Sequence, residues 1–107
     1  MDYSEIVKAY CIKFNKKFID RDSMILLDKN TAIECIRYIV EQKFSLVCVD
    51  GFFLFPENRI QPIQDHSIDF TRSPFNNLTK IQIESEVMKF FQNEPNGVFY
   101  EIVVNEP

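Results

Sequence analysis

Apolar residues recur every three or four positions in three stretches of this chain, a spacing that predicts amphipathic helices. The stretches cover residues 4–17, residues 28–42 and residues 77–92. Asp28 is a favourable N-cap for the second helix, because its carboxylate can accept hydrogen bonds from the free amides of the first turn. The run Glu94-Pro95-Asn96-Gly97 ends the third helix.

A long run from Phe44 to Phe55, rich in aromatic and β-branched residues, predicts a strand. Its interruption at Asp50-Gly51 indicates either a bulge within one strand or a tight turn between two. We favour the bulge, because Pro56 to Arg59 already provides a hairpin turn. Residues 60–64 then return antiparallel, and Pro62 favours a position at the sheet edge.

Residues 98–104 form a second aromatic and β-branched run that is apolar on both faces except at Glu101, which predicts a central strand. Residues 20–23 read as a loop, and Met24 to Leu27 as a short strand or an apolar plug beneath the second helix. Residues 65–77 have no periodicity and are expected to form a long irregular loop.

This order of elements predicts an α+β fold in a single domain covering residues 1–107. We expect a small antiparallel or mixed sheet of about three to four strands, with about three helices packed on it.

Composition adds two features. The chain has 11 Phe and no Trp, which are many rings for so small a core, so a few are expected at a contact surface. The net charge is -4, and residues 55–107 carry all of it, with eight acidic and four basic side chains. This half disfavours nucleic acid as a partner and favours a basic protein.

The three cysteines, Cys11, Cys35 and Cys48, each lie in an apolar pattern without the spacing of a zinc site. Buried, reduced thiols in a cytoplasmic protein are the expected interpretation. The chain shows neither a signal-peptide pattern nor a long uncharged apolar run, so we expect no membrane association.

The motifs argue against an enzyme. His66 is the only histidine. Its neighbours Asp65 and Ser67 point to the side of an extended chain opposite to His66 and cannot form a catalytic relay with it. We therefore expect a solvated loop histidine. Two glycines are too few for a phosphate-binding loop, so no cofactor is expected.

Three carboxylates, Asp50, Asp65 and Asp69, would suit a divalent cation if the hairpin brought them together. The chain lacks a glycine-bearing calcium loop, and such residues more often cap turns. We expect no metal site.

The middle of the chain resembles a family of bacterial polymorphic-toxin immunity proteins, immunity domain family forty. In that family a helix like Thr31-Ala32-Ile33-Glu34-Cys35-Ile36 leads into an apolar strand that ends in two glycines, an aspartate and an apolar or aromatic pair; a segment with a proline and an aspartate, a helix and a strand follow. Here Val47 to Phe52 and Gln61 to Asp65 stand at the two later positions, so the resemblance covers about residues 28–104. Cys48 and Val49 replace the two glycines, and the family's tryptophan is absent.

The resemblance implies a small cytoplasmic protein that binds and neutralises a cognate toxin domain, for example a nuclease with a basic cleft. Acidic and aromatic side chains of the second half would form the contact surface: Asp50, Phe52, Glu57, Asp65, Asp69, Phe70 and Phe75. A small non-catalytic interaction module with another protein partner is the alternative. Formation of a homodimer through an exposed strand also stays open.

Overall fold

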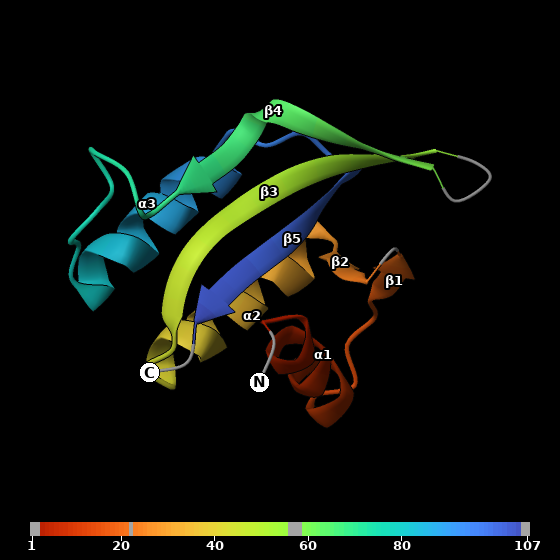
Figure 1. The fold of residues 1–107 in the computed structure, drawn as a ribbon, viewed down its shortest axis with the longest axis horizontal. Helices are drawn as coiled ribbons and strands as arrows, with labels where there is room; N and C mark the ends of the chain where they lie inside the picture. The colour runs from red at the N-terminus through yellow and green to blue at the C-terminus, as the bar shows by residue number, and fades with distance from the viewer. Residues whose placement is uncertain (1–2, 22, 56–58, 106–107) are drawn as a thin grey trace.

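The computed structural model describes residues 3–21, 23–55 and 59–105, in which three helices pack on one face of a five-stranded antiparallel sheet (Figure 1). The α+β prediction is confirmed, with five strands in place of three or four. The elements are α1 (Tyr3–Lys13), β1 (Ile19–Arg21), β2 (Met24–Leu27), α2 (Lys29–Glu41), β3 (Ser45–Phe55), β4 (Arg59–Asp69), α3 (Lys80–Gln92) and β5 (Val98–Asn105).

The strand order is β1-β2-β5-β3-β4. The C-terminal strand is therefore central and β4 lies at an edge, both as predicted. The strand interpretation of Met24 to Leu27 is also confirmed, but the expected loop at 20–23 was wrong in part, because Ile19–Arg21 pairs with β2. Ser23 turns this short hairpin with a φ of 66°, and three residues of backbone pairing were too short to give a sequence pattern.

The predicted irregular loop at 65–77 was wrong over its first five residues, because β4 continues to Asp69. Gly51 pairs with Ile63 while Asp50 pairs with Ser67, so residues 64–66 are extra on the β4 side. The predicted interruption at Asp50-Gly51 is therefore not a turn, because β3 runs through it without a break. The irregularity is a bulge, but its extra residues lie in β4 and not in β3 as predicted. A polar edge strand with three extra residues shows no alternation in its sequence.

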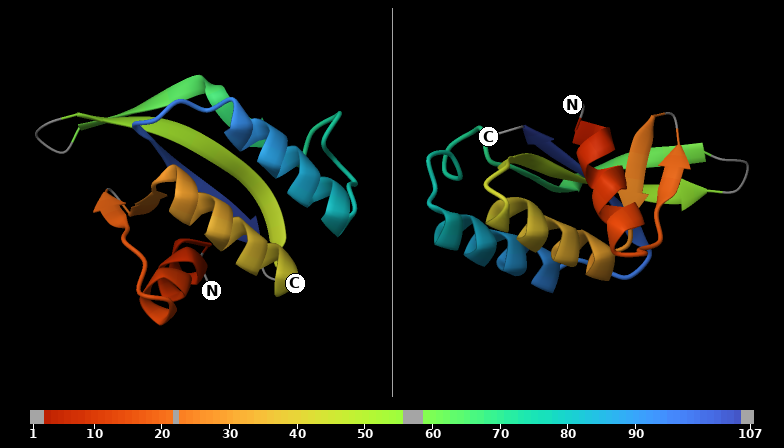
Figure 2. Two further views of the ribbon diagram at one scale, coloured as in Figure 1. Left: turned by 180° about the vertical axis from the view of Figure 1, so that it is seen from behind. Right: turned by 90° about the horizontal axis from the view of Figure 1, so that it is seen from below.

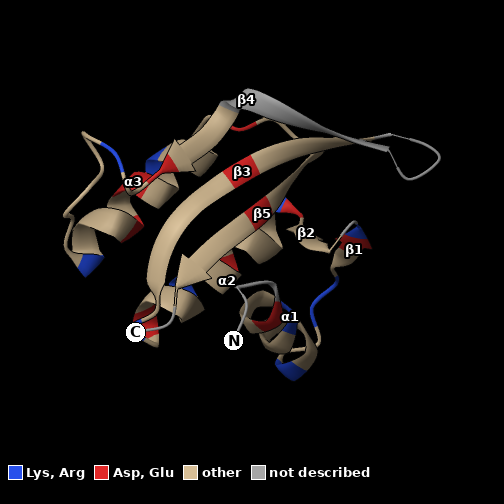
Figure 3. Cartoon of the chain, viewed as in Figure 1, with Lys and Arg blue, Asp and Glu red and all other residues tan. Residues whose placement is uncertain are grey.

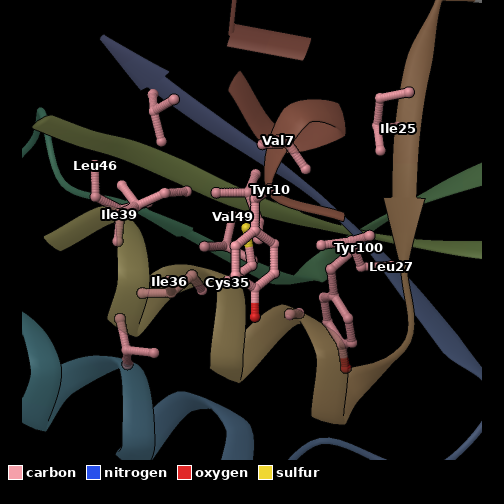
Figure 4. Close-up of a cluster of buried hydrophobic side chains, with 14 of the residues drawn as sticks. Val7, Tyr10, Ile25, Leu27, Cys35, Ile36, Ile39, Leu46, Val49 and Tyr100 are labelled. Carbon is pink, nitrogen blue, oxygen red and sulfur yellow. The ribbon is translucent and has the colours of Figure 1, made fainter. Parts of the chain in front are cut away.

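The core lies between the sheet and the helices. Figure 4 shows Tyr10 from α1, Cys35 and Ile39 from α2, and Val49 and Tyr100 from the sheet converging on it. Cys35, Ile39, Val49 and Tyr100 are fully buried, and each buried aliphatic side chain of this size contributes about 1.5–3 kcal/mol. The two further views in Figure 2 show α1, α2 and α3 on the same side of the sheet.

The helix ends follow from their capping residues. The Asp28 carboxylate accepts from the Thr31 amide at 2.8 Å, as predicted for the start of α2. At the other end of α2 the Lys43 amide bonds to Val40 and the Phe44 amide to Ile39, a Schellman motif that places Lys43 at a φ of 66°.

The other two helices are shorter than predicted. A second Schellman motif, with Asn15 at a φ of 55° and a bond from the Lys16 amide to Cys11, ends α1 at Lys13 and not at residue 17. In α3 the Thr79 hydroxyl and the Gln82 side chain form a capping box, so the helix begins at Lys80 and not at 77.

Candidate functional site

The face of the sheet that the helices leave uncovered carries the first group of predicted contact residues. Asp50 pairs with Glu101 across β3 and β5, and Phe52 pairs with Phe99. Side chains alternate along a strand, so all four lie on the face opposite to Val49, Tyr100 and Ile102, which point into the core. Figure 3 shows the acidic segments of β3 and β5 side by side in the middle of the sheet.

The thiol of Cys48 lies among three carboxylates on this face. Its Sγ is 3.6 Å from Oδ2 of Asp50, to which it donates, and Cys48 pairs with Asp69 across β3 and β4. Burial, followed by the charge and hydrogen bond of Asp50 and the charges of Asp69 and Glu101, raises the pKa of Cys48 to about 12. The strand pairings of Cys48 with Asp69 and of Asp50 with Glu101 bring the three acids to one place. We call Cys48, Asp50, Asp69 and Glu101, with the flanking Phe52 and Phe99, the acidic sheet face.

Asp69 is fixed as an anion by the turn that follows it. Its Oδ1 accepts hydrogen bonds from the Thr71 amide at 2.8 Å and from the Thr71 hydroxyl at 2.6 Å. These bonds, aided by Arg72, hold the pKa of Asp69 below its usual range. A carboxylate in this setting caps a turn and still leaves Oδ2 directed to Arg72 at 3.6 Å.

The acids differ in exposure. Asp50 and Asp69 are half-buried, whereas Glu101 is 7% exposed. Asp50 and Asp69 can therefore touch a partner directly, and Glu101 contributes chiefly to the local field.

The predicted phenylalanine anchors are less accessible than the acids. Phe52 and Phe70 are each 8% exposed, and Phe70 belongs to the helix-side core. Phe75 is half-buried and meets the Phe70 ring edge-on, with the ring centroids 6.3 Å apart. Of these three rings, Phe75 has the most surface for a contact. Glu57 and the side chain of Asp65 lie outside the described residues.

The expectation of a solvated loop histidine at position 66 was wrong. His66 lies in the β4 bulge, and its Nδ1 is 2.6 Å from Oε2 of Glu94. Oε1 of the same carboxylate accepts from the Tyr100 hydroxyl at 2.9 Å. The Glu94 side chain is 5% exposed and that of His66 is 25% exposed, so the network joins β4, the end of α3 and β5 beneath the sheet.

Sequence reasoning missed this network because its members are far apart in the chain. Glu94 reads as part of the turn that stops α3, and Tyr100 as one more ring in an apolar strand. Lys29 adds a fourth member, since its Nζ donates to the Glu94 carbonyl at 3.0 Å. The one signal for this network in the sequence was the position of Glu94, which precedes the central strand β5 by only a few residues.

An imidazole held by a carboxylate is the pairing used in general-base catalysis. Catalysis also needs a nucleophile and room for a substrate. His66 does not line the grooves beside α1 or between α2 and α3. Through these contacts the network ties β4, the segment after α3 and β5 together.

Metal binding and membrane insertion receive no support from the described part of the chain. Within it, no three His, Cys, Asp or Glu side chains are placed to hold a metal ion. Nor is any helix there long and apolar enough to cross a membrane.

Burial also holds the thiols of the core in their neutral form. It raises the pKa of Cys11 to about 11 and the pKa of Cys35 still further.

No protein family, curated protein or solved structure matches this chain.

Proposed function

We propose that this chain is an immunity protein that neutralises a toxin domain by binding it through the acidic sheet face. The observation that supports this proposal is the meeting of Asp50, Asp69 and Glu101 around Cys48 on the side of the sheet that no helix covers. Three strands contribute one carboxylate each to the same place on this face. The two acids that sequence reasoning selected, and whose side chains the structure describes, are both in it.

Charge on such a surface acts first on the encounter rate. A toxin domain that cleaves nucleic acid carries a basic cleft, and an acidic face attracts it over several ångströms before contact. After docking, the carboxylates of Asp50 and Asp69 would occupy positions that substrate phosphates otherwise take. The half-buried Phe99 beside them would supply apolar area to the contact.

The cysteines support a cytoplasmic location, where an antidote to an incoming toxin would be needed. Cys11 and Cys35 are buried free thiols, and Cys48 is a half-buried one. Thiols persist in this state in a reducing compartment.

Co-expression with the product of the gene immediately upstream is the direct test. If the proposal holds, this chain rescues growth when that product is toxic, and the two proteins co-purify. If the upstream product is harmless, or if it remains toxic at equal expression, the immunity function is wrong. The chain would then be better explained as an interaction module for another protein.

Charge variants test the surface separately. The double variant Asp50→Asn, Asp69→Asn keeps the size of both side chains, and it should slow association with the toxin about five- to tenfold at low salt. The salt dependence of the association rate should fall with it. Glu41→Gln is the matched control, since Glu41 is an exposed acid on α2. Equal rates for the double variant and the control would remove the acidic sheet face from the interface.

A further inference from the structure

A second surface feature lies on the opposite side of the molecule, where the end of α2 approaches the start of α3. The two helices run in opposite directions beneath the sheet (Figure 2), and the segment between β4 and α3 closes the space between them. The result is a groove of about 500 Å³, within the range of roughly 300–1,000 Å³ typical of small-molecule sites. We call it the α2–α3 groove.

The floor and walls of the groove are apolar. Val40, Leu46 and Phe70, each less than a tenth exposed, form the floor. The walls are partly buried side chains that pack against the core: Phe44, Phe75, Leu78 and Ile83. An alkyl chain placed here would exchange water for apolar contacts along its whole length.

The rim of the groove is cationic. Lys43 and Lys80 line it and are exposed, and no acidic side chain in the described part of the chain lines it. Among the described residues neither lysine has a carboxylate partner, whereas Lys8, Lys16 and Lys89 each do. The first turn of α3 adds its positive end, because the capping box satisfies only some of the amides there.

The rim is also held in place by backbone structure. Lys43 is fixed at a φ of 66° by the Schellman motif that ends α2, and Asn77 has a φ of 61° just before the capping box of α3. A left-handed conformation is uncommon at a lysine, and here it presents the side chain at the mouth of the groove. The backbone that carries the two lysines is thus ordered by the ends of α2 and α3.

We propose that the α2–α3 groove binds a linear alkyl carboxylate, with the chain along the apolar floor and the carboxylate between Lys43 and Lys80. The chemistry follows from the lining: apolar walls select the chain, and two unpaired cations select the anionic head. The inference is independent of the proposed function, since the acidic sheet face contributes nothing to the groove.

Calorimetric titration with dodecanoate, below its micelle-forming concentration, tests the site. We expect saturable binding of one molecule per chain. Dodecyltrimethylammonium has the same chain and the opposite charge, and butyrate has the same head and a short chain; both should bind at least about tenfold more weakly. Equal affinity for the cationic amphiphile, or no saturable binding of dodecanoate, would overturn the proposal.

Variants locate the site. Lys43→Gln and Lys80→Gln should each weaken dodecanoate binding about two- to fivefold, and the double variant by about the product. Lys89→Gln is the matched control, because Lys89 lies on the same helix, pairs with Glu86 and does not line the groove. Unfolding midpoints equal to that of the unmodified chain would show that lost binding is not lost folding. If the double variant binds as well as the control, the groove is not the site.

Nuclear magnetic resonance distinguishes this groove from the groove beside β1, which has a similar volume. Dodecanoate should shift the amide signals of Leu78, Lys80 and Ile83 in the α2–α3 groove. Shifts centred on Phe18 and Leu26, which line the groove beside β1, would assign the ligand elsewhere and contradict the proposal.

Discussion

Gly51 lies directly against the backbone of His66. A Cβ at Gly51 would stand 2.8 Å from the His66 carbonyl oxygen and 2.9 Å from the His66 Cβ. The bulge of residues 64–66 therefore folds onto β3 only because position 51 has no side chain. The same bulge directs His66 beneath the sheet, where Nδ1 meets the Glu94 carboxylate.

Gly51→Ala should lower the free energy of unfolding by about 1–3 kcal/mol, because the added methyl group must displace backbone and not a flexible side-chain end. Urea denaturation measures the loss. Gly97→Ala is an informative comparison: position 97 has open space around it and a φ of 89°, so its cost comes from backbone conformation alone. If Gly51→Ala proves neutral, the close approach of the two strands is wrong.

Tyr100→Phe should cost about 1–3 kcal/mol of unfolding free energy, because the buried Glu94 carboxylate loses one of its donors while the ring packing is kept. Thermal and urea unfolding both measure this loss of unfolding free energy. Tyr10→Phe is the control, since the described residues offer the Tyr10 hydroxyl no hydrogen-bond partner. Equal effects of the two substitutions would show that the hydroxyl of Tyr100 adds nothing to the network.

Stability should depend on pH through Asp69. Its pKa is lower in the folded chain, chiefly because Thr71 donates two hydrogen bonds to the ionised form. This contribution is present above the pKa of the unfolded chain and is lost as the pH falls through the folded pKa.

The measurement is the urea midpoint between about pH 2 and about pH 6. Asp69→Asn should flatten the rise of the midpoint with pH, and Thr71→Val, which keeps the amide donor but removes the hydroxyl, should flatten it partly. If the urea midpoint of Asp69→Asn rises with pH as steeply as that of the unmodified chain, the hydrogen bonds from Thr71 to Asp69 do not stabilise the fold.

Alkylation of Cys48 reports the field of the acidic sheet face. With its pKa raised to about 12, Cys48 should react with iodoacetamide at pH 8.5 at least about a hundredfold more slowly than in the unfolded chain. Asp50→Asn should speed the reaction several-fold, because it removes the nearest charge. Peptide mass spectrometry identifies the labelled cysteine, and Glu41→Gln should leave the rate unchanged. Fast labelling of Cys48 in the folded chain would contradict the placement of its thiol in the acidic sheet face.

Much of the fold could be predicted from the sequence, because the patterns that specify these elements are local. The apolar stripe of α2 and the carboxylate of Asp28 specify a helix and its first turn from residues that are neighbours in the chain. The central position of residues 98–104 followed from a strand that is apolar on both faces, and the sheet edge at β4 from Pro62. Asp50 and Asp69 were predicted as contact residues from the sequence; the structure brings both to the uncovered face of the sheet, and their contact with a partner stays a prediction.

Tertiary structure decided what depends on pairing between distant segments. The first residues of the expected loop became strand because β3 supplies their backbone hydrogen bonds, and His66 became a network member because Glu94 lies below the bulge. Glu101 joined the acidic sheet face through the register of β5 against β3. Register sets which side chains share a face, and a pattern along one strand carries no information about its neighbour's alignment.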